Sequence, residues 1–424
     1  TLIYGIGTGI QSLSAFVLIP IITLNVGIEG FGSYAILISL STISAGVFYF
    51  GMTSALPRSY FEFDALDHRI RVFSVGLQLT ILGALLQLIL ATIVYLFVDL
   101  NIFGLPPEHK ISFLYCMISS SVLMINQYLL LKFRLDYRPL TFVSLNALYF
   151  FALIFYTFHL LDNSTNPLVD IFRSLLIVNS LFCIVIFITI GFKSIQIVNL
   201  LNDINLLKYM LVFGFFQIIA STGQALTETV DRFMLLRFFS VNDVGIYYSY
   251  SRLSALIYVM FCIPFSLVWA SVSMDIMNSK NRDKIISEVF SMYLYLGYSF
   301  IILISIFSED LFNFLIKGDI ILFNFVLFSF MAVSSIYFGL MAVMSVSFFY
   351  DRKIHLLALC YYIALPFKIL AFLALVPDYG ITYLGVVSVL SSLVVLTCCF
   401  WLTRKGSRLK VHWKFVSIIT FIFI

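Results

Sequence analysis

The chain has 424 residues, of which 62% are hydrophobic and 11% charged, and its net charge is +4. Ordinary globular domains are about 45–50% apolar and about 25% charged, so this chain has too little charge to cover a water-soluble surface. The composition excludes a cytosolic enzyme, a nucleic-acid-binding protein and a disordered protein. Long runs without Asp, Glu, Lys or Arg, such as 142–161 and 325–350, predict membrane-spanning helices rather than the alternating strands of an outer-membrane barrel.

Apolar segments divide the chain into twelve predicted spans, separated by short intervals. These spans are 2–24, 31–54, 72–98, 111–131, 140–161, 168–192, 209–238, 244–272, 285–308, 320–349, 354–376 and 381–403. A further apolar segment starts near Val411, so we expect about 12 transmembrane helices, or 14 if that segment continues. None of the intervals reaches the roughly 40 residues that an independent domain needs. The expected fold is an all-α integral membrane protein.

Positive charge alternates between the two sets of intervals. Most of the 25 Lys and Arg fall in one set, which includes the intervals around 57–71, 132–138 and 404–414. The opposite set holds only Lys110 and Lys317. Because positive residues concentrate on the cytoplasmic side of a membrane protein, we expect a multi-pass protein with a cytoplasmic N-terminus.

A weak internal repeat relates the two halves of the chain. Gly32-x-Tyr34 and Gly245-x-Tyr247 are 213 residues apart, and the same offset moves the first predicted span onto the seventh. Six spans is an even number, so the repeat is parallel, with both halves starting on the same side. We therefore expect two six-helix lobes related by a parallel pseudo-repeat around a central cavity. The expected domains are an N-terminal lobe, a cytoplasmic linker, a C-terminal lobe, and a basic cytoplasmic segment with the start of a further transmembrane helix: 1–192, 193–208, 209–403 and 404–424.

Four basic residues lie within predicted spans and are not explained by the charges of the intervals. They are Arg173, Arg232, Arg252 and Lys368. A charge at the bilayer centre costs about 2.5–3.5 kcal/mol even on the lenient insertion scale, so it is expected to face a partner or water. Lys368 is the deepest of them, whereas Arg173 is close enough to a span end to reach the interface. A structural ion pair is the alternative to a functional role.

The seventh predicted span carries a stripe of polar residues at helical spacing. The uncharged and acidic members of this stripe are Gln217, Ser221, Gln224 and Glu228. Glu228, Asp231 and Arg232 occupy positions i, i+3 and i+4, which share a helix face. The stripe predicts exposure to a water-filled cavity. Glu228 and Asp231 are candidates for ion coupling, and a structural pair between Glu228 and Arg232 is the alternative. The first span has a shorter, uncharged stripe of Thr8, Gln11 and Ser14.

Other chemistry has little support in the sequence. The five His do not have metal-ligand spacing, and the six Cys all lie inside apolar segments. There is no phosphate-binding loop of the kind that binds ATP. No Ser, His and Asp cluster suggests a nucleophile. We therefore expect no metal site, no cofactor, no catalytic residue and no enzymatic activity. Tyr247, Tyr248 and Tyr250 lie near a span end, which is typical of an interfacial belt, with sugar stacking as the alternative.

Several passages resemble one known family. They are 4–13, Gly30–Tyr34, Phe50–Glu62, Glu228–Leu235 and Asp243–Leu253. They are similar to the polysaccharide-biosynthesis flippases, the Wzx-type translocases of O-antigen and other lipid-linked oligosaccharides. These flippases belong to the multidrug/oligosaccharidyl-lipid/polysaccharide exporter superfamily. The resemblance follows the span order over nearly the whole chain.

The resemblance implies a protein of the bacterial cytoplasmic (inner) membrane. Such a protein moves a polyprenyl-pyrophosphate-linked repeat unit of O-antigen, lipopolysaccharide or a related polysaccharide from the cytoplasmic to the periplasmic leaflet by alternating access. The implied partners are the lipid-linked glycan, the bilayer, and the polysaccharide polymerase with its chain-length machinery. Arg58, Asp231, Arg232 and Arg252 stand in the matching passages, so the resemblance implies a cavity role for them. Lys368 joins this set for its charge and depth.

Three other functions remain open. The first is an ion-coupled antiporter of drugs or organic cations from the same superfamily. The deep charges Arg232, Arg252 and Lys368 exceed the acids Glu228 and Asp231 by one, which favours an anionic substrate instead. A membrane-embedded glycan polymerase or ligase is the second, and a non-transporting assembly scaffold is the third. With no nucleotide site, a proton or sodium gradient is the expected energy source.

Overall fold

A computed structural model describes most of the chain: residues 2–60, 66–162, 164–191, 195–196, 203–277, 281–317, 321–350 and 353–404. The helices of the first half are α1 Leu2–Phe48, α2 Met52–Tyr60, α3 Leu66–Phe97, η1 Leu100–Phe103, η2 Pro107–His109, α4 Lys110–Leu135, α5 Pro139–Leu161, α6 Pro167–Ile190 and α7 Ile204–Phe238. Those of the second half are α8 Val241–Ile257, the π-helical turn η4 Tyr258–Cys262, α9 Ile263–Met277, α10 Arg282–Ile306, α11 Ser308–Leu315, α12 Phe325–Tyr350, α13 Ile354–Tyr379 and α14 Tyr383–Arg404. Among the described residues, 11 helical segments are long and apolar enough to cross a membrane, which confirms an all-α integral membrane fold.

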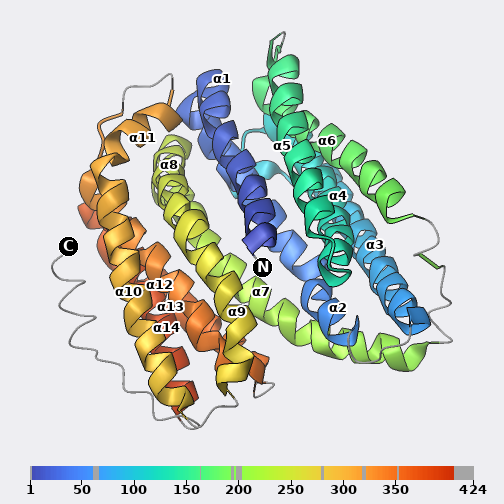
Figure 1. Cartoon of the computed structure of the whole chain (residues 1–424). Coiled ribbons are helices and arrows are strands. Elements are labelled where there is room, and N and C mark those ends of the chain that lie inside the picture. Colours follow the sequence, from blue (N-terminus) through green and yellow to red (C-terminus); the bar gives the residue numbers. More distant parts are fainter. Residues whose placement is uncertain are drawn as a thin grey trace. The chain divides into compact units, whose positions relative to one another are not determined.

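The first two predicted spans are joined without a loop. The first span and most of the second lie within α1, which is interrupted only at Gly27, where φ is 66° and ψ is −175°. That backbone conformation is open to glycine because glycine lacks a Cβ. The expected interval over 25–30 is thus reduced to a sharp break at Gly27, with helical residues on both sides of it. In Figure 1, α1 starts at the label N, reaches the top of the view, and the chain then comes down to α2.

A second break separates α1 from α2. Phe50 and Gly51 both have positive φ, 50° and 65°, and they fall inside the predicted span 31–54. Gly51 lies against α7, because a Cβ added to it would be 2.7 Å from Gly214 Cα. The span therefore ends in a sharp turn that holds the end of α1 against the first part of α7.

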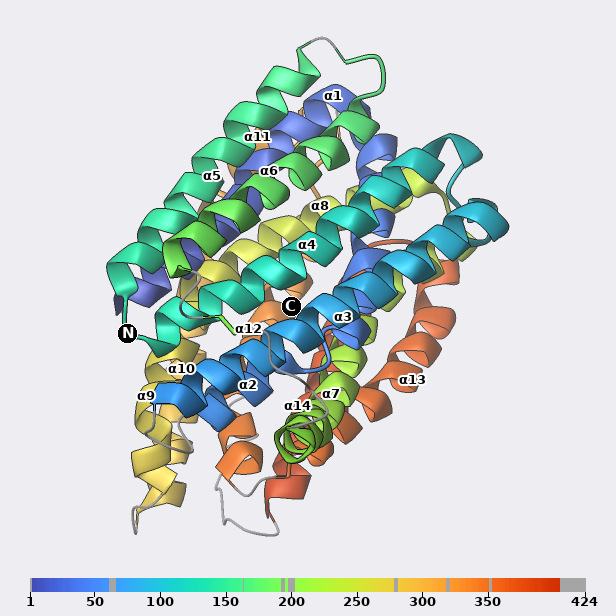
Figure 2. The same ribbon diagram turned by 90° about the vertical axis from the view of Figure 1, so that its right-hand side faces the viewer.

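One compact unit, unit 2, is formed by residues Ile6–Val26 and Ser33–Leu226. In it α4 packs against both α3 and α6, and α5 packs against α6, an arrangement that Figure 2 shows side by side. Proline at the first helical position starts α5 and α6, at Pro139 and Pro167. Proline suits that position because its missing N–H would have no helical partner there.

The other compact unit, unit 1, comprises Thr1–Gly5, Gly27–Gly32 and the chain from Thr227 onward. Its central helix is α12, which packs against α14, α8, α10 and α9, and 67% of the residues in an apolar stretch of this helix are buried. Helix α8 begins with a capping box, in which Ser240 and Asp243 bond reciprocally to each other's backbone N–H.

The compact units divide inside α7, between Leu226 and Thr227. The expected lobes 1–192 and 209–403 place that boundary earlier, in the linker 193–208. They remain a prediction, as does a cavity between lobes. Of the linker, the structure describes 195–196 and 203–208, and nearly all of the predicted segment 404–424 lies outside the described residues.

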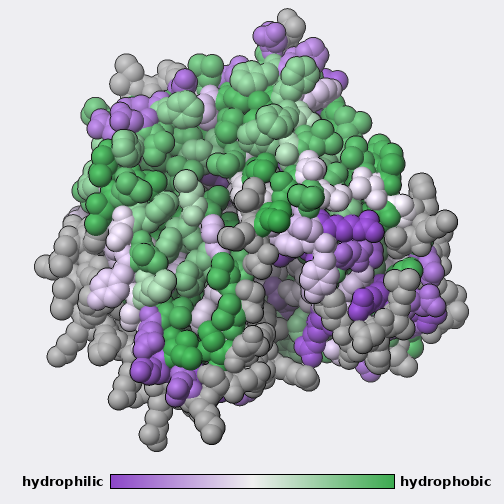
Figure 3. Space-filling model, in the orientation of Figure 1, coloured by the Kyte–Doolittle hydropathy of each residue, from purple (hydrophilic) through white to green (hydrophobic). Residues whose placement is uncertain are grey.

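Exposed apolar side chains follow individual helices at helical spacing. On α3 they include Leu82, Leu85, Leu86, Ile89, Ile93 and Leu96. In Figure 3, the region of α8 and α10 shows a broad apolar surface between hydrophilic residues near the upper and lower edges. An apolar helix face left exposed to this extent is expected to contact lipid.

Candidate functional site

Three charged residues of α7 that were predicted to share one face differ in their surroundings. Asp231 and Arg232 are buried, with 1% and 9% of their surface exposed, whereas Glu228 is exposed. The first two therefore point into unit 1. Since a buried charge must be compensated, the partners of Asp231 and Arg232 define the site.

Asp231 is the centre of a polar cluster contributed by three helices. Its Oδ2 lies 2.6 Å from Lys368 Nζ of α13, and it accepts a 2.6 Å hydrogen bond from the hydroxyl of Tyr247 of α8. Lys368 Nζ also donates a 2.6 Å hydrogen bond to the Thr227 carbonyl. The two charged side chains are only 5% and 2% exposed, so the deepest predicted cation is paired inside the unit.

Arg232 is held beside an aromatic ring together with a second arginine. Its Cζ lies 4.5 Å from the ring centroid of Tyr248, and Arg252 Cζ lies 4.6 Å from the same centroid. Arg252 also donates a hydrogen bond to the Tyr248 hydroxyl. Phe31 supports the ring at a centroid distance of 5.0 Å. Guanidinium groups over a tyrosine face gain cation–π attraction, which offsets part of the repulsion between two like charges.

The charge of this cluster is positive. Lys368 neutralises Asp231, which leaves Arg232 and Arg252 with the carboxylate of Glu228. Both Glu228 and Arg252 act electrostatically on Arg232. The arrangement therefore gathers two guanidinium groups on one ring, while the exposed carboxylate of Glu228 is the acidic group of this set outside the buried pair.

The remaining predicted site residues lie in unit 2. Arg58, in the last turn of α2, has its Cζ 4.6 Å from the Phe213 ring centroid and 5.8 Å from that of Tyr209. Gln217 lines a pocket there, and Gln11 and Gln224 are half-buried. Arg58 thus contacts the α7 surface of unit 2, whereas Arg232, Arg252 and Lys368 belong to unit 1.

Two tyrosines of the site were assigned to an interfacial belt by sequence reasoning. Tyr247 and Tyr248 are instead buried within unit 1, with 4% and 0% of their surface exposed. Their hydroxyl and ring face compensate Asp231 and the two arginines. The tyrosines of α8 were themselves the available signal, because a tyrosine combines an apolar ring with a hydroxyl that can bond to a buried charge.

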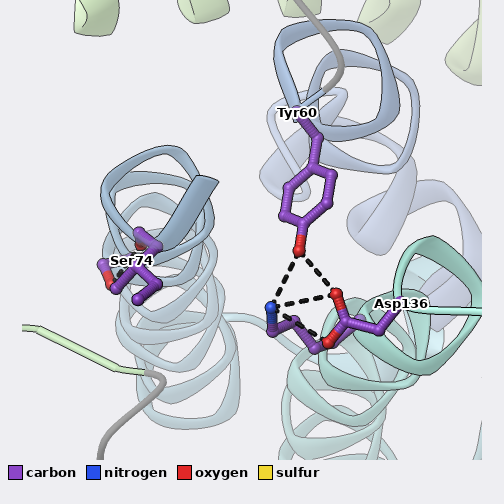
Figure 4. A network of polar contacts seen from close by, with 5 residues as sticks. Tyr60, Ser74 and Asp136 are labelled. Carbon is purple, nitrogen blue, oxygen red and sulfur yellow. Dashed lines mark hydrogen bonds and ion pairs between the residues drawn. The ribbon is translucent and has the colours of Figure 1, made fainter. Parts of the chain in front are cut away.

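A second network, in unit 2, was missed by sequence reasoning and is shown in Figure 4. Tyr60 donates a 2.6 Å hydrogen bond to Asp136 Oδ1, and Lys132 Nζ lies 2.9 Å from the Tyr60 hydroxyl and 3.1 Å from Asp136 Oδ2. Lys132 was assigned to the cytoplasmic intervals as a loop charge, yet it is buried at 6% exposure. Its i,i+4 spacing from Asp136 was the available signal. A Lys, an Asp and a Tyr thus form a cluster in each unit.

Comparisons with known proteins show relatives by structure. Neither a family model nor a curated sequence matches the chain. Among solved structures, the chain is similar to the lipid II flippase MurJ in an inward closed conformation, with a TM-score of 0.70 and 14% identity over 95% of this chain and 88% of that one. It is also similar to the MATE transporter VcmN of Vibrio cholerae, with a TM-score of 0.66 and 12% identity over 95% of both chains.

A third similar structure extends this set. It is an outward-facing multidrug resistance MATE family transporter of the MOP superfamily, with a TM-score of 0.63 and 11% identity over 94% of this chain and 92% of that one. At these identities the likeness shows the fold. The chain has the multi-pass helical fold that MATE transporters share with the lipid II flippase, and these neighbours are membrane transporters and flippases rather than enzymes.

Proposed function

We propose that this protein flips a polyprenyl-pyrophosphate-linked oligosaccharide from the cytoplasmic to the periplasmic leaflet of a bacterial inner membrane by alternating access. The cargo is a repeat unit of O-antigen or a related surface polysaccharide, as in the Wzx-type flippases. The polymerase of that polysaccharide and its chain-length machinery then act on the product. The observation that carries the proposal is the pair of arginines on Tyr248.

The chemistry of this pair suits a pyrophosphate. A guanidinium is planar and donates two parallel hydrogen bonds to phosphate oxygens, and it keeps its charge when it is desolvated. Asp231 does not cancel Arg232 or Arg252, because Lys368 already neutralises it at 2.6 Å. The likeness to the lipid II flippase supports a lipid-linked cargo in this fold.

An ion-coupled antiporter of drugs or organic cations is the second candidate. It is supported by the likeness to MATE transporters and by the exposed carboxylate of Glu228, a group that can attract a cation or exchange a proton. In the flippase, Glu228 and Asp231 are the residues through which a proton or sodium gradient is coupled. Glu228→Gln removes the exposed carboxylate and keeps both arginines, so this variant tests ion coupling separately from recognition of the anion.

Deletion of the gene tests the proposal. The polyprenyl-pyrophosphate lipids are extracted from the deletion strain, and the leaflet of any accumulated glycan is determined. Complete repeat units facing the cytoplasm, with loss of surface polysaccharide, are expected. Unchanged glycan lipids with a higher sensitivity to cationic drugs would establish the antiporter instead.

Complementation with matched arginine variants tests the role of the cluster. Arg252→Gln removes a guanidinium that is proposed to bond the pyrophosphate, and a lost hydrogen bond to a charged group costs about 1.5–3 kcal/mol, so glycan export is expected to fall by about tenfold to hundredfold. The control is Arg173→Gln, because Arg173 is 52% exposed and its Asp170 contact is 3.9 Å long. Equal export by both variants, at equal membrane abundance, would remove the cluster from the mechanism.

A further inference from the structure

The first part of α7, in unit 2, exposes an apolar face. Only 22% of the residues in an apolar stretch of Leu206–Phe238 are buried, the lowest share among the described membrane segments. Gly214 of this helix faces the turn at Phe50 and Gly51, so the exposed residues form the outer side. They have 37–57% of their surface exposed and are Ile204, Tyr209, Leu211, Val212, Phe215 and Phe216. Such a face is expected to contact the acyl chains of lipids.

Two cations lie at the start of this face. Arg58 of α2 has its Cζ 4.6 Å from the ring centroid of Phe213 and 5.8 Å from that of Tyr209, and α2 lies beside the first part of α7 in Figure 1. Lys208 directly precedes Tyr209 and is exposed, whereas Arg58 is half-buried. Both cations can therefore be reached from outside the helices of unit 2.

The helical spacing places Arg58 at the edge of the apolar face. Tyr209, Val212 and Phe216 occupy positions i, i+3 and i+7, so they share one side of α7. Arg58 contacts the first of them and Phe213 beside them. A guanidinium that lies on aromatic rings uses its face for that contact, which leaves the N–H groups along its edge available to an acceptor.

The nearby acid is already compensated. Asp203, one residue before α7, forms an ion pair with Arg71 of α3 at 3.4 Å. Neither Arg58 nor Lys208 forms an ion pair with the part of the chain that the structure describes. The start of α7 thus carries two uncompensated cations beside an exposed apolar surface.

This combination selects an amphiphile with an anionic head group. The distribution of Lys and Arg predicts that this end of α7 lies at the cytoplasmic leaflet, where basic sites between helices bind anionic lipid head groups. A phosphodiester presents two free oxygens, which match the parallel N–H groups of one guanidinium. A zwitterionic lipid brings its own cation toward Arg58 and Lys208, so the site favours a lipid with net negative charge.

We infer that the start of α7 binds one anionic phospholipid of the phosphatidylglycerol type. Arg58 and Lys208 hold its phosphate, and an acyl chain lies along Val212 and Phe216. The inference does not depend on the proposed function, because a flippase and an antiporter contact the same leaflet. It gives Arg58 a lipid phosphate as its ligand, whereas the resemblance to the flippases implies a cavity role.

Native mass spectrometry of the purified protein tests this site. The probes are dioleoyl phosphatidylglycerol and dioleoyl phosphatidylcholine, which have the same acyl chains. The wild type is expected to bind phosphatidylglycerol in preference. Arg58→Gln should weaken that binding by about tenfold, as expected when a hydrogen bond to a charged group is lost. Lys208→Gln should weaken it by about fivefold, the effect of one basic residue near an anionic surface.

The matched control is Arg138→Gln. Arg138 is exposed and belongs to a basic interval that is expected on the same side of the membrane, but it lies outside α2 and α7. Phosphatidylglycerol binding that survives in this variant and falls in Arg58→Gln supports the inference. Equal binding of the two lipids by the wild type overturns it, and so does equal weakening by Arg58→Gln and Arg138→Gln. Lys208 is exposed, so its variant decides the question if Arg58→Gln does not accumulate in the membrane.

Competition with undecaprenyl phosphate separates a bilayer lipid from the cargo. If this probe displaces phosphatidylglycerol from the wild type at an equimolar ratio, the site takes the lipid-linked cargo and the phospholipid inference is wrong. If Arg58→Gln loses phosphatidylglycerol binding and still exports glycan in the leaflet assay, both the inference and the flippase stand. If the wild type exports cationic drugs and leaves glycan lipids unchanged, the proposed function is wrong, and the lipid titration still decides the inference.

Discussion

At the scale of single residues, Asp231 has a stabilising partner that a single substitution can remove. Its Oδ2 meets both Lys368 and Tyr247, while its Oδ1 makes no hydrogen bond within the described residues. The ammonium of Lys368 therefore supplies most of the compensation for this buried carboxylate. Breaking a buried pair by removal of one partner is strongly destabilising because the other charge stays uncompensated.

We predict that Lys368→Met lowers the free energy of unfolding by about 3–5 kcal/mol. The measurement is reversible unfolding in mixed micelles by titration with a denaturing detergent. The double variant Lys368→Met with Asp231→Leu should recover most of the loss, since it buries no charge. Full stability of Lys368→Met would mean that Asp231 is not charged in the folded protein.

The control for this prediction is an exposed ion pair. Lys284 and Glu288 lie 3.9 Å apart with 79% and 66% of their side chains exposed. Exposed pairs contribute about 0–1 kcal/mol, so Lys284→Met should change stability little. A similar loss in both variants would show that the effect comes from removing any lysine rather than from burial.

Residue types predicted which charged side chains lie within spans, but they did not predict which of these side chains are buried or which partners they have. The cost of a charge in a span singled out Arg232, Arg252 and Lys368, and all three take part in contacts within unit 1. Their partners are set by tertiary packing: Lys368 reaches Thr227 across a sequence separation of 141. Sequence spacing offered a pair between Glu228 and Arg232, which do act on each other electrostatically, but it did not predict the partner that Asp231 takes from α13.

At the scale of elements, the repeat offset reappears as a contact between two helices. A Cβ added to Gly32 would overlap the Val241 carbonyl and lie 3.0 Å from Gly245 N, and one added to Gly245 would overlap the Ile28 carbonyl. The offset of 213 residues carries Ile28 onto Val241 and Gly32 onto Gly245. The contact is thus reciprocal, as an approximate two-fold relation between α1 and α8 requires.

We predict that Gly245→Ala destabilises the protein or prevents its accumulation in the membrane, because the new methyl group meets backbone rather than a movable side chain. Gly9→Ala is the matched control. Gly9 is helical and has no atom within 4 Å of an added Cβ, so alanine should raise stability by roughly 0.5–1 kcal/mol. Unfolding in mixed micelles measures both variants, and normal stability of Gly245→Ala would show that α1 and α8 are not in close contact.

The same offset compares the polar residues of the first and seventh predicted spans. It pairs Gln11 with Gln224, so the polar stripe is a property of the repeat. However, it places Leu18 and Ile19 opposite Asp231 and Arg232. The charged cluster therefore belongs to the second half alone. Spacing predicted the repeat, and only the residue identities show that the charges of the seventh span have no counterpart in the first.

At the scale of the whole molecule, the lengths of the apolar segments predicted the number of membrane helices better than they predicted the connections between those helices. Runs of apolar residues identify membrane segments because each must fill the hydrocarbon thickness. The connections between helices depend on single residues. Gly27 forms the break between the first two predicted spans inside α1, and the positive φ angles of Phe50 and Gly51 separate α1 from α2 within the predicted span 31–54. Hydropathy does not record such backbone angles, and the first segment accordingly runs for 58 residues.

The distribution of Lys and Arg makes one further prediction, the orientation of the chain in the membrane. Glu108 and Arg138 are exposed positions at opposite ends of α4, Lys110–Leu135, and only the interval after α4 is strongly basic. In Glu108→Cys a membrane-impermeant maleimide should label intact cells whose outer membrane is opened. In Arg138→Cys labelling should require permeabilised inner membranes, because positive intervals stay in the cytoplasm.

The parent protein gives the background, since its six cysteines are buried or half-buried. Labelling of both variants from one side would mean that α4 does not span the membrane. The reversed pattern would put the N-terminus outside and contradict flipping toward the periplasm.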